Sequence, residues 1–139
     1  MANDGGISRV KKRLAAIPKE VKEAVQPSLM RQANQMANTM RRFAPVDTGA
    51  LRESITVTPG GQSTPPYSQP GGSMTVPENA VAITVGNSDV RYGHLVEYGT
   101  SKTKAQPFFW PAARLHNKKA KTAIKSAIRR AVKKHWGTG

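Results

Sequence analysis

Nonpolar residues recur at helical spacing in the N-terminal part of the chain. They follow one another at steps of one to four residues along two stripes, first Ile7, Val10, Leu14, Ile17 and Val21, then Leu29, Ala33, Met36, Ala37, Met40 and Phe43. Pro18 interrupts the first stripe, and Pro27 suits the first turn of the second helix, where a missing N–H costs nothing. The pattern predicts a helical region over residues 6–44, as two amphipathic helices or as one kinked helix.

A further helix is expected near the C-terminus, over residues 107–136. Pro111 fits its first turn, and Gly137 is placed to end it. A thin nonpolar stripe follows this helix, formed by Leu115, Ala120, Ile124, Ala127, Ile128, Ala131 and His135, with Val132 beside it. Because the rest of the surface is polar, the stripe predicts that only one side of the helix is buried.

Nonpolar and polar residues alternate in two short central segments, which predicts two half-buried strands. The first lies in residues 45–58, after a turn, and the second in residues 80–98, with the inward positions Ile55, Val57, Val81, Ile83 and Val85. The simplest pairing of the two strands is antiparallel. Residues 91–98 are expected to form a turn or a short helix, with Tyr92, Leu95 and Val96 facing inward.

Two segments lack a regular pattern. Residues 59–79 contain five prolines and four glycines, a density that no helix or central strand tolerates, so we expect a long flexible loop. Residues 99–106 predict a second flexible loop, which is basic. Together these features predict one α+β domain over residues 1–139. Long N-terminal and C-terminal helices would pack with a small, mainly antiparallel sheet and a long Pro/Gly-rich loop.

Composition adds a strong positive charge. The 139 residues include 22 lysines and arginines against 8 acidic residues, a net charge of +14. Residues 101–139 contain eleven basic residues and no acidic one. This balance predicts attraction to nucleic acid, to an anionic membrane or to an acidic protein. The candidate contacts to DNA or to an acidic partner, all in the last helix, are Lys118, Lys121, Lys125, Arg129, Arg130 and Lys133.

The chain offers little chemistry for catalysis. It has no cysteine, which excludes disulfides and thiolate metal sites, and no histidine has an acid spaced as in a catalytic triad. His94 and Glu97 could share one side of a helix, but two ligands make a poor metal site. We therefore expect no enzyme activity, no metal and no cofactor. We also expect no membrane association, because no nonpolar run is long enough to span a bilayer and the last helix has only a thin stripe.

Aromatic residues cluster at the start of the last helix, where Phe108, Phe109 and Trp110 stand between Pro107 and Pro111. Two interpretations are open. The cluster could anchor the helix in the core, or Phe109 and Trp110 could fill a pocket of a neighbouring subunit, since tryptophan and phenylalanine are enriched at interface centres. In the second case the loop that carries Lys102 and Lys104 would belong to the same interface.

Two motifs resemble those of a known phage protein family. Residues 44–55 read Ala-Pro-Val-Asp-Thr-Gly-Ala-Leu-Arg-Glu-Ser-Ile. Residues 96–102 read Val-Glu-Tyr-Gly-Thr-Ser-Lys, and residues 106–112 follow with Gln-Pro-Phe-Phe-Trp-Pro-Ala. In sequence and order they are similar to the tail-component proteins of long-tailed double-stranded DNA bacteriophages, also called neck, tail-completion or head–tail joining proteins. The resemblance spans residues 7–135.

The resemblance implies a structural virion protein without enzyme activity. It implies a sixfold ring between the tail tube and the head-closure proteins, assembled in the host cytoplasm, with DNA passing through the lumen. For the residues that match the family's motifs, the resemblance implies structural roles. They would shape the turn into the sheet and the start of the second loop, and they would position the last helix. These residues are Asp47, Thr48, Gly49 and Leu51, then Glu97, Tyr98, Gly99 and Thr100, and finally Pro107, Phe108 and Pro111. The alternative, from charge alone, is a small basic nucleic-acid-binding protein.

Overall fold

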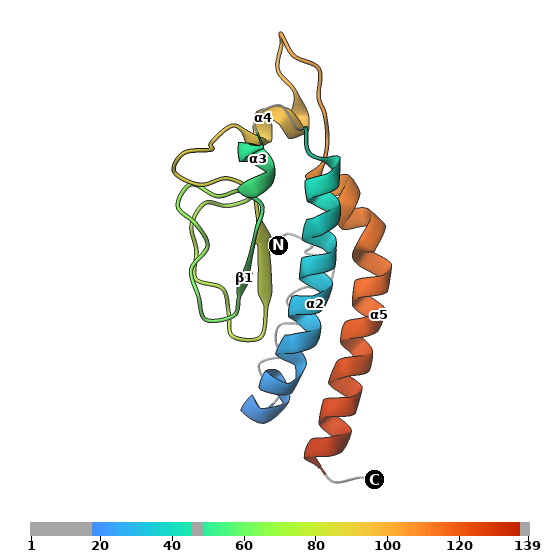
Figure 1. The fold of residues 1–139 in the computed structure, drawn as a ribbon. Helices are drawn as coiled ribbons and strands as arrows, with labels where there is room; N and C mark the ends of the chain where they lie inside the picture. The colour runs from blue at the N-terminus through green and yellow to red at the C-terminus, as the bar shows by residue number, and fades with distance from the viewer. Residues whose placement is uncertain (1–17, 46–48, 137–139) are drawn as a thin grey trace, which may run out of the picture.

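The computed structural model describes residues 18–45 and 49–136 and confirms the α+β class (Figure 1). The elements in chain order are α2 (Lys19–Phe43), α3 (Ala50–Glu53), β1 (Thr56–Pro59), β2 (Val81–Thr84), α4 (Gly93–Tyr98) and α5 (Phe109–His135). The two long helices, α2 and α5, run antiparallel, and α2 lies between α5 and the two strands. No helix in these two ranges is long and nonpolar enough to cross a membrane.

The helix α2 is continuous over 25 residues, so it does not begin near Pro27. Pro18 directly precedes it, and the Pro18 carbonyl accepts hydrogen bonds from the N–H groups of Val21 and Lys22. Pro27 lies inside the helix and is exposed, and the prediction that it occupies a first turn was wrong. Pro27 removes one helical hydrogen bond because proline has no N–H. The contacts of α2 with α5 and with the sheet offset this loss. The predicted stripe over residues 7–17 lies outside the described residues.

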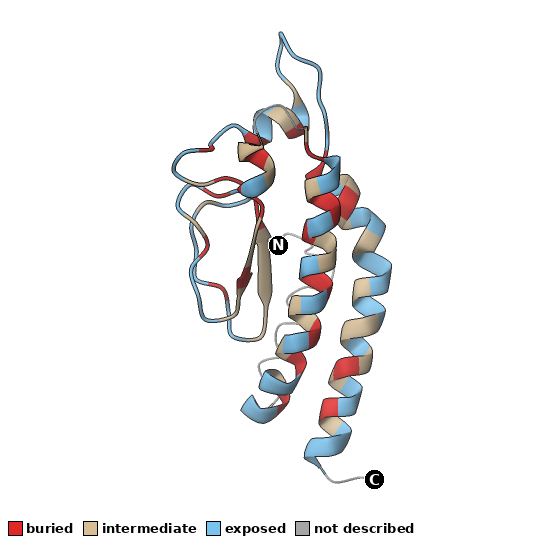
Figure 2. Cartoon of the chain, in the orientation of Figure 1, coloured by how far each residue is buried: buried red, intermediate tan, exposed pale blue. Residues whose placement is uncertain are grey.

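The helix α2 contributes buried residues, drawn red in Figure 2, to two nonpolar clusters, one toward the sheet and one toward α5. Toward the sheet, Ala37 and Met40 belong to the main core cluster, which also contains Ile55, Val85 and Phe108. Toward α5, a second cluster joins Val21 and Val25 of α2 with Ala131, and the partly buried Leu29, Ile128 and Val132 pack against it. Phe43, expected on the buried stripe, is 44% exposed at the end of the helix.

The strands β1 and β2 pair antiparallel, as predicted, with Thr56 opposite Thr84 and Pro59 opposite Val81. The Pro/Gly-rich segment that joins them is not free of structure. Its two arms exchange backbone hydrogen bonds of 2.8 Å, from Gly61 N–H to the Val76 carbonyl and from Val76 N–H to the Gln62 carbonyl. Its prolines exclude long strands but allow these isolated pairs, so the segment is a loop whose two arms are joined, and its flexibility stays a prediction.

The helix α5 begins at Phe109, close to the predicted start, and Pro111 lies in its first turn. Ala127 and Ala131 are buried, as the stripe predicted. Leu115, however, is 67% exposed, and His135 is exposed as well. Leu115 precedes Ala127 by twelve residues, which at 3.6 residues per turn places it about 120° around the helix from the buried side.

Candidate assembly surface

One end of the molecule gathers α3, α4 and the start of α5 (Figure 1). From this end residues 100–107, here called the arm, project as an exposed loop. The arm is closed at its base, where the N–H of Gln106 donates to the carbonyl of Val96 at 2.8 Å. Gly99 permits this closure because its φ is +78° and a Cβ there would lie 2.7 Å from the backbone nitrogen of Ala105.

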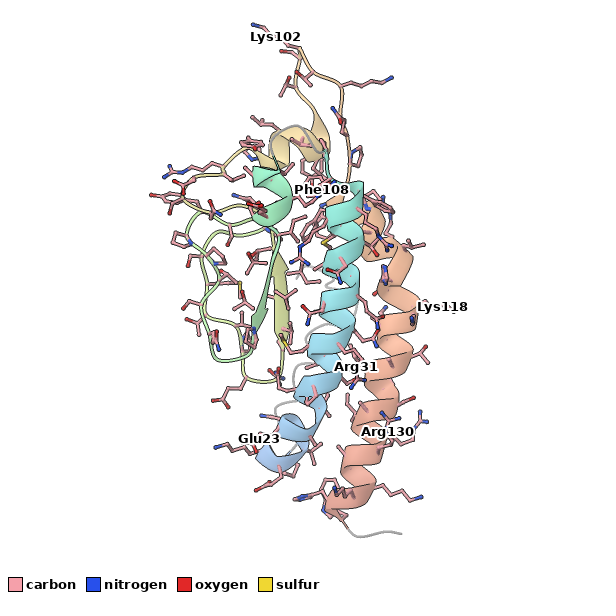
Figure 3. All side chains as sticks on the ribbon, viewed as in Figure 1. Glu23, Arg31, Lys102, Phe108, Lys118 and Arg130 are labelled. Atoms are coloured by element: carbon pink, nitrogen blue, oxygen red, sulfur yellow. The ribbon has the colours of Figure 1, made fainter. Side chains whose placement is uncertain are left out.

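The arm carries the two lysines that were predicted at an interface. Lys102 and Lys104 are both exposed, and Figure 3 shows Lys102 at the tip, away from the body of the molecule. The turn before them is organised by Thr100, whose hydroxyl accepts hydrogen bonds from the N–H groups of Lys102 and Thr103. The arm is therefore a defined projection with positive charge at its outer end.

Glu97 of α4 joins the base of the arm to α5. Its side chain is only 7% exposed. Oε1 accepts hydrogen bonds of 2.9 Å from the N–H groups of Phe108 and Phe109, and Oε2 accepts one of 3.2 Å from Trp110. A carboxylate at this place also interacts favourably with the positive end of the helix dipole.

These three bonds complete the N-terminus of α5. A helix leaves its first four N–H groups without intrahelical partners. In α5 these belong to Phe108, Phe109, Trp110 and Pro111, and proline has no N–H to satisfy. Phe108 at the N-cap position makes no side-chain cap bond, so Glu97 does alone what a local serine or aspartate does in most helices.

The structure gives Glu97 a role that the sequence did not suggest, at the start of α5. It was expected to shape the start of the second loop and was considered as a metal ligand with His94. In the structure His94 is exposed, Glu97 is engaged by α5, and no group of three potential metal ligands occurs in the described part of the chain. The inward positions of α4 are Gly93 and Glu97, whereas the prediction that Tyr92 and Leu95 face inward was wrong.

The aromatic cluster at the start of α5 contains two core residues and one exposed residue. Phe108 is fully buried and Phe109 is 7% exposed, and both belong to the main core (Figure 3 labels Phe108). Phe109 is therefore not available to a neighbouring subunit. Trp110 is 40% exposed, and its indole N–H donates to the hydroxyl of Tyr98 at 2.7 Å, while Tyr98 itself is 68% exposed. The pair Tyr98–Trp110 is the part of the cluster that a partner can reach.

A groove of about 550 Å³ opens beside the arm. Its nonpolar lining includes Leu51, Tyr92, Leu95 and Val96, and the arm contributes polar residues such as Lys104. Tyr92 and Leu95 are 38% and 45% exposed. We call this groove, the arm and the pair Tyr98–Trp110 the apical surface. Exposed nonpolar side chains that gather in this way mark sites of protein contact.

The first motif lies at the same end. Asp47 and Thr48 are outside the described residues. Gly49 precedes α3 with a φ of +76°, and Leu51 is buried in the main core. Their role in shaping the turn into the sheet stays a prediction. Ser54 was not singled out from the sequence, yet its buried hydroxyl donates to the Leu51 carbonyl at 2.6 Å and accepts from the N–H of Gly86 at 3.1 Å.

The cationic residues of α5 form a second surface. All nine lysines and arginines of this helix are exposed. Five of them, spaced by three or four residues, share one side and are called the outer stripe: Arg114, Lys118, Lys121, Lys125 and Arg129. Lys118 precedes the buried Ala127 by nine residues, about two and a half turns, so the stripe faces away from α2 (Figure 3). Arg130 instead borders a groove between α2 and α5 together with Arg31, and Lys133 is exposed near the end of the helix.

A model of the HK97-gp10-like family, described as "Bacteriophage HK97-gp10, putative tail-component", matches residues 8–99. This match covers well over half of the chain. The chain belongs to the HK97-gp10-like family. No curated protein and no solved structure matches it.

The match covers part of the apical surface, including Leu51, Tyr92, Leu95 and Tyr98, but neither the arm nor Trp110. In this HK97-gp10-like protein the matched range includes the first motif, both strands and α4 with Glu97, and it ends at Gly99. The arm and α5, with the outer stripe, follow the matched range. Membership makes the protein a bacteriophage tail component, a structural part of a phage particle. Within it, Glu97 is one of the residues that join the matched region to the last helix, together with Tyr98, which accepts a hydrogen bond from Trp110.

Proposed function

We propose that this protein completes the tail or neck of a tailed phage, as a non-enzymatic subunit of a ring at the head–tail junction. The ring would be sixfold, would contact the tail tube and the head-closure proteins, and would leave a lumen for the genomic DNA. Family membership supports a tail component, and the resemblance of the two motifs to head–tail joining proteins supports the position at the junction.

The exposed side chains of the apical surface are the main support for this proposal. A single subunit leaves Tyr92, Leu95, Tyr98 and Trp110 exposed beside a projecting basic arm. Aromatic side chains that are rigid and partly nonpolar are the usual anchors of protein interfaces, and a tryptophan is prominent among them. A head-to-tail contact in which these residues meet a different surface of the next copy closes into a ring when the rotation is right.

Shortening the arm tests the proposal in assembled particles. Replacing residues 101–105 by two glycines keeps Gln106 and its bond to Val96 while it removes Lys102 and Lys104 from the projection. A phage defective in this gene would be complemented with the variant, and joined particles would be counted by electron microscopy. We expect heads and tails to accumulate separately, and a normal yield of joined particles would refute the role of the arm.

The two exposed tryptophans of the region around α5 supply a matched pair. Trp110 at the start of the helix belongs to the apical surface, whereas Trp136 directly follows the helix at its other end and is 56% exposed. Trp110→Ala should reduce the number of joined particles at least tenfold, and Trp136→Ala should leave it unchanged. Equal effects of the two changes would show that the apical surface is not the site of subunit contact.

A further inference from the structure

We infer that the outer stripe of α5 binds the phosphate backbone of duplex DNA without reading its sequence. The stripe consists of Arg114, Lys118, Lys121, Lys125 and Arg129, all exposed on one side of a regular helix. This surface is separate from the apical surface, and the inference does not depend on the proposed ring.

Within the described residues, no acidic side chain pairs with the cations of the outer stripe. The one ion pair among the described residues joins Lys19 to Glu23 on α2, at 3.9 Å. No carboxylate pairs with any cation of α5 within residues 18–45 and 49–136, and α5 contains no acidic residue. Like charges four residues apart, such as Lys121 and Lys125, destabilise an isolated helix. An extended polyanion along the stripe would relieve this repulsion.

The five cations of the outer stripe lie in a row along α5. Arg114 and Arg129 are separated by fifteen residues, about 22 Å along a helix that rises 1.5 Å per residue. Duplex DNA presents a phosphate every ~3.4 Å of its axis on each strand, so about six phosphates of one strand occupy this length. Five cations spread over this length can oppose a similar number of phosphates on the side of the duplex that the helix contacts.

The composition of the outer stripe favours DNA over an acidic protein as its binding partner. Lysine is depleted in the core of protein interfaces, where aromatic and other nonpolar side chains supply the contact. The outer stripe consists of cations alone, whereas three exposed aromatic residues, Tyr92, Tyr98 and Trp110, gather at the apical surface. Lysines and arginines aligned without such anchors are typical of contacts to phosphates, which position a protein on DNA but carry no sequence information.

Salt-dependent binding of the purified full chain tests the inference. Binding to a fluorescent 30-base-pair duplex would be followed by anisotropy between 50 and 200 mM salt. Neutralising about five phosphates predicts a slope of about −4 in a plot of log K against log salt concentration, a loss of roughly several-hundred-fold over this range. Two duplexes of unrelated sequence should bind equally well.

Variants locate the binding on the stripe. Lys118→Gln, Lys121→Gln and Lys125→Gln together should make the slope shallower by about 2 to 3, because three phosphate contacts are lost. The corresponding three changes to arginine should preserve it. The control removes the same net charge elsewhere, by Lys19→Gln, Lys22→Gln and Lys102→Gln, and should bind like the natural chain. Circular dichroism would show that all the variants keep their helices.

Three results would overturn the inference. The first is no salt-dependent binding of duplex by the natural chain at 50 mM salt. The second is an equal loss in the control and the stripe variant, which would assign binding to overall charge. The third is tighter binding of a polyglutamate peptide than of duplex at the same salt concentration, which would indicate an acidic protein partner. None of these results bears on whether the apical surface joins heads to tails, so the two proposals fail separately.

Discussion

Replacing Glu97 by glutamine should loosen the start of α5 while almost preserving the size of the side chain. The carboxylate accepts three backbone hydrogen bonds, from Phe108, Phe109 and Trp110. A glutamine can keep its carbonyl oxygen toward the first two N–H groups, but its amide nitrogen then faces the N–H of Trp110, donor against donor. Glu97→Gln therefore removes one bond and turns two charge-assisted bonds into neutral ones.

The magnitude follows from these losses. A hydrogen bond to a charged group contributes about 1.5–3 kcal/mol and a neutral one about 0.5–1.5 kcal/mol. A negative charge at a partly buried helix N-terminus adds up to ~2 kcal/mol. Burial of the carboxylate offsets part of this gain. We expect Glu97→Gln to lower the free energy of unfolding by about 2–3 kcal/mol, and Glu97→Ala by about 3–5 kcal/mol, because alanine leaves buried N–H groups without partners.

Urea denaturation followed by circular dichroism measures these changes, and Glu53→Gln is the control. Glu53 is an exposed glutamate of α3 at the same end of the molecule, so its replacement should change the free energy of unfolding by less than about 0.5 kcal/mol. Hydrogen exchange supplies a local readout, since the amides of Phe108 and Phe109 should exchange faster in Glu97→Gln than in the natural chain. If Glu97→Gln is as stable as the control and these amides keep their protection, the capping role is refuted.

Two further substitutions test how the loops are held. Ser54→Ala removes a buried hydroxyl that accepts from the N–H of Gly86, and it should lower the free energy of unfolding by about 1–3 kcal/mol in urea denaturation; a loss below about 0.5 kcal/mol would contradict the role of this bond. Gly60→Ala would place a Cβ 2.7 Å from the carbonyl oxygens of Pro77 and Glu78. It should cost about 1–3 kcal/mol, and an unchanged melting temperature would show that the two arms of the Pro/Gly-rich segment are not packed so closely.

Local periodicity located the two long helices and the two strands but not the four-residue α3, which lies where a turn and a strand were predicted. Nonpolar residues at helical spacing located α2 and α5, and alternation located β1 and β2 with their antiparallel pairing. The same reasoning failed for the position of Pro27 and for the burial of Leu115, because contacts between distant elements determine both. Pro27 lies inside α2 because α5 and the sheet stabilise the helix on both sides, a contribution that no local pattern contains. Leu115 was assigned to the buried stripe of α5, but it lies about 120° around the helix axis from the buried side and is exposed.

The candidate site was only partly predictable. The exposed lysines of α5 and of the arm follow from composition, because cations without acidic neighbours remain at the surface. The bonds of Glu97 span eleven to thirteen residues, and no short motif encodes them. One signal was present, namely that Gln106, Pro107 and Phe108 offer no serine, threonine, aspartate or asparagine to cap the helix that follows. A helix start without a local cap requires an acceptor from elsewhere in the chain.

Cryo-electron microscopy of the complete phage particle would locate this protein. We expect a single ring of it at the head–tail junction, with the apical surface of each copy, including Trp110 and the arm, covered by the next copy or by an adjoining virion protein. Density for this protein along the length of the tail tube, or a ring in which the apical surfaces stay exposed to solvent, would contradict this expectation.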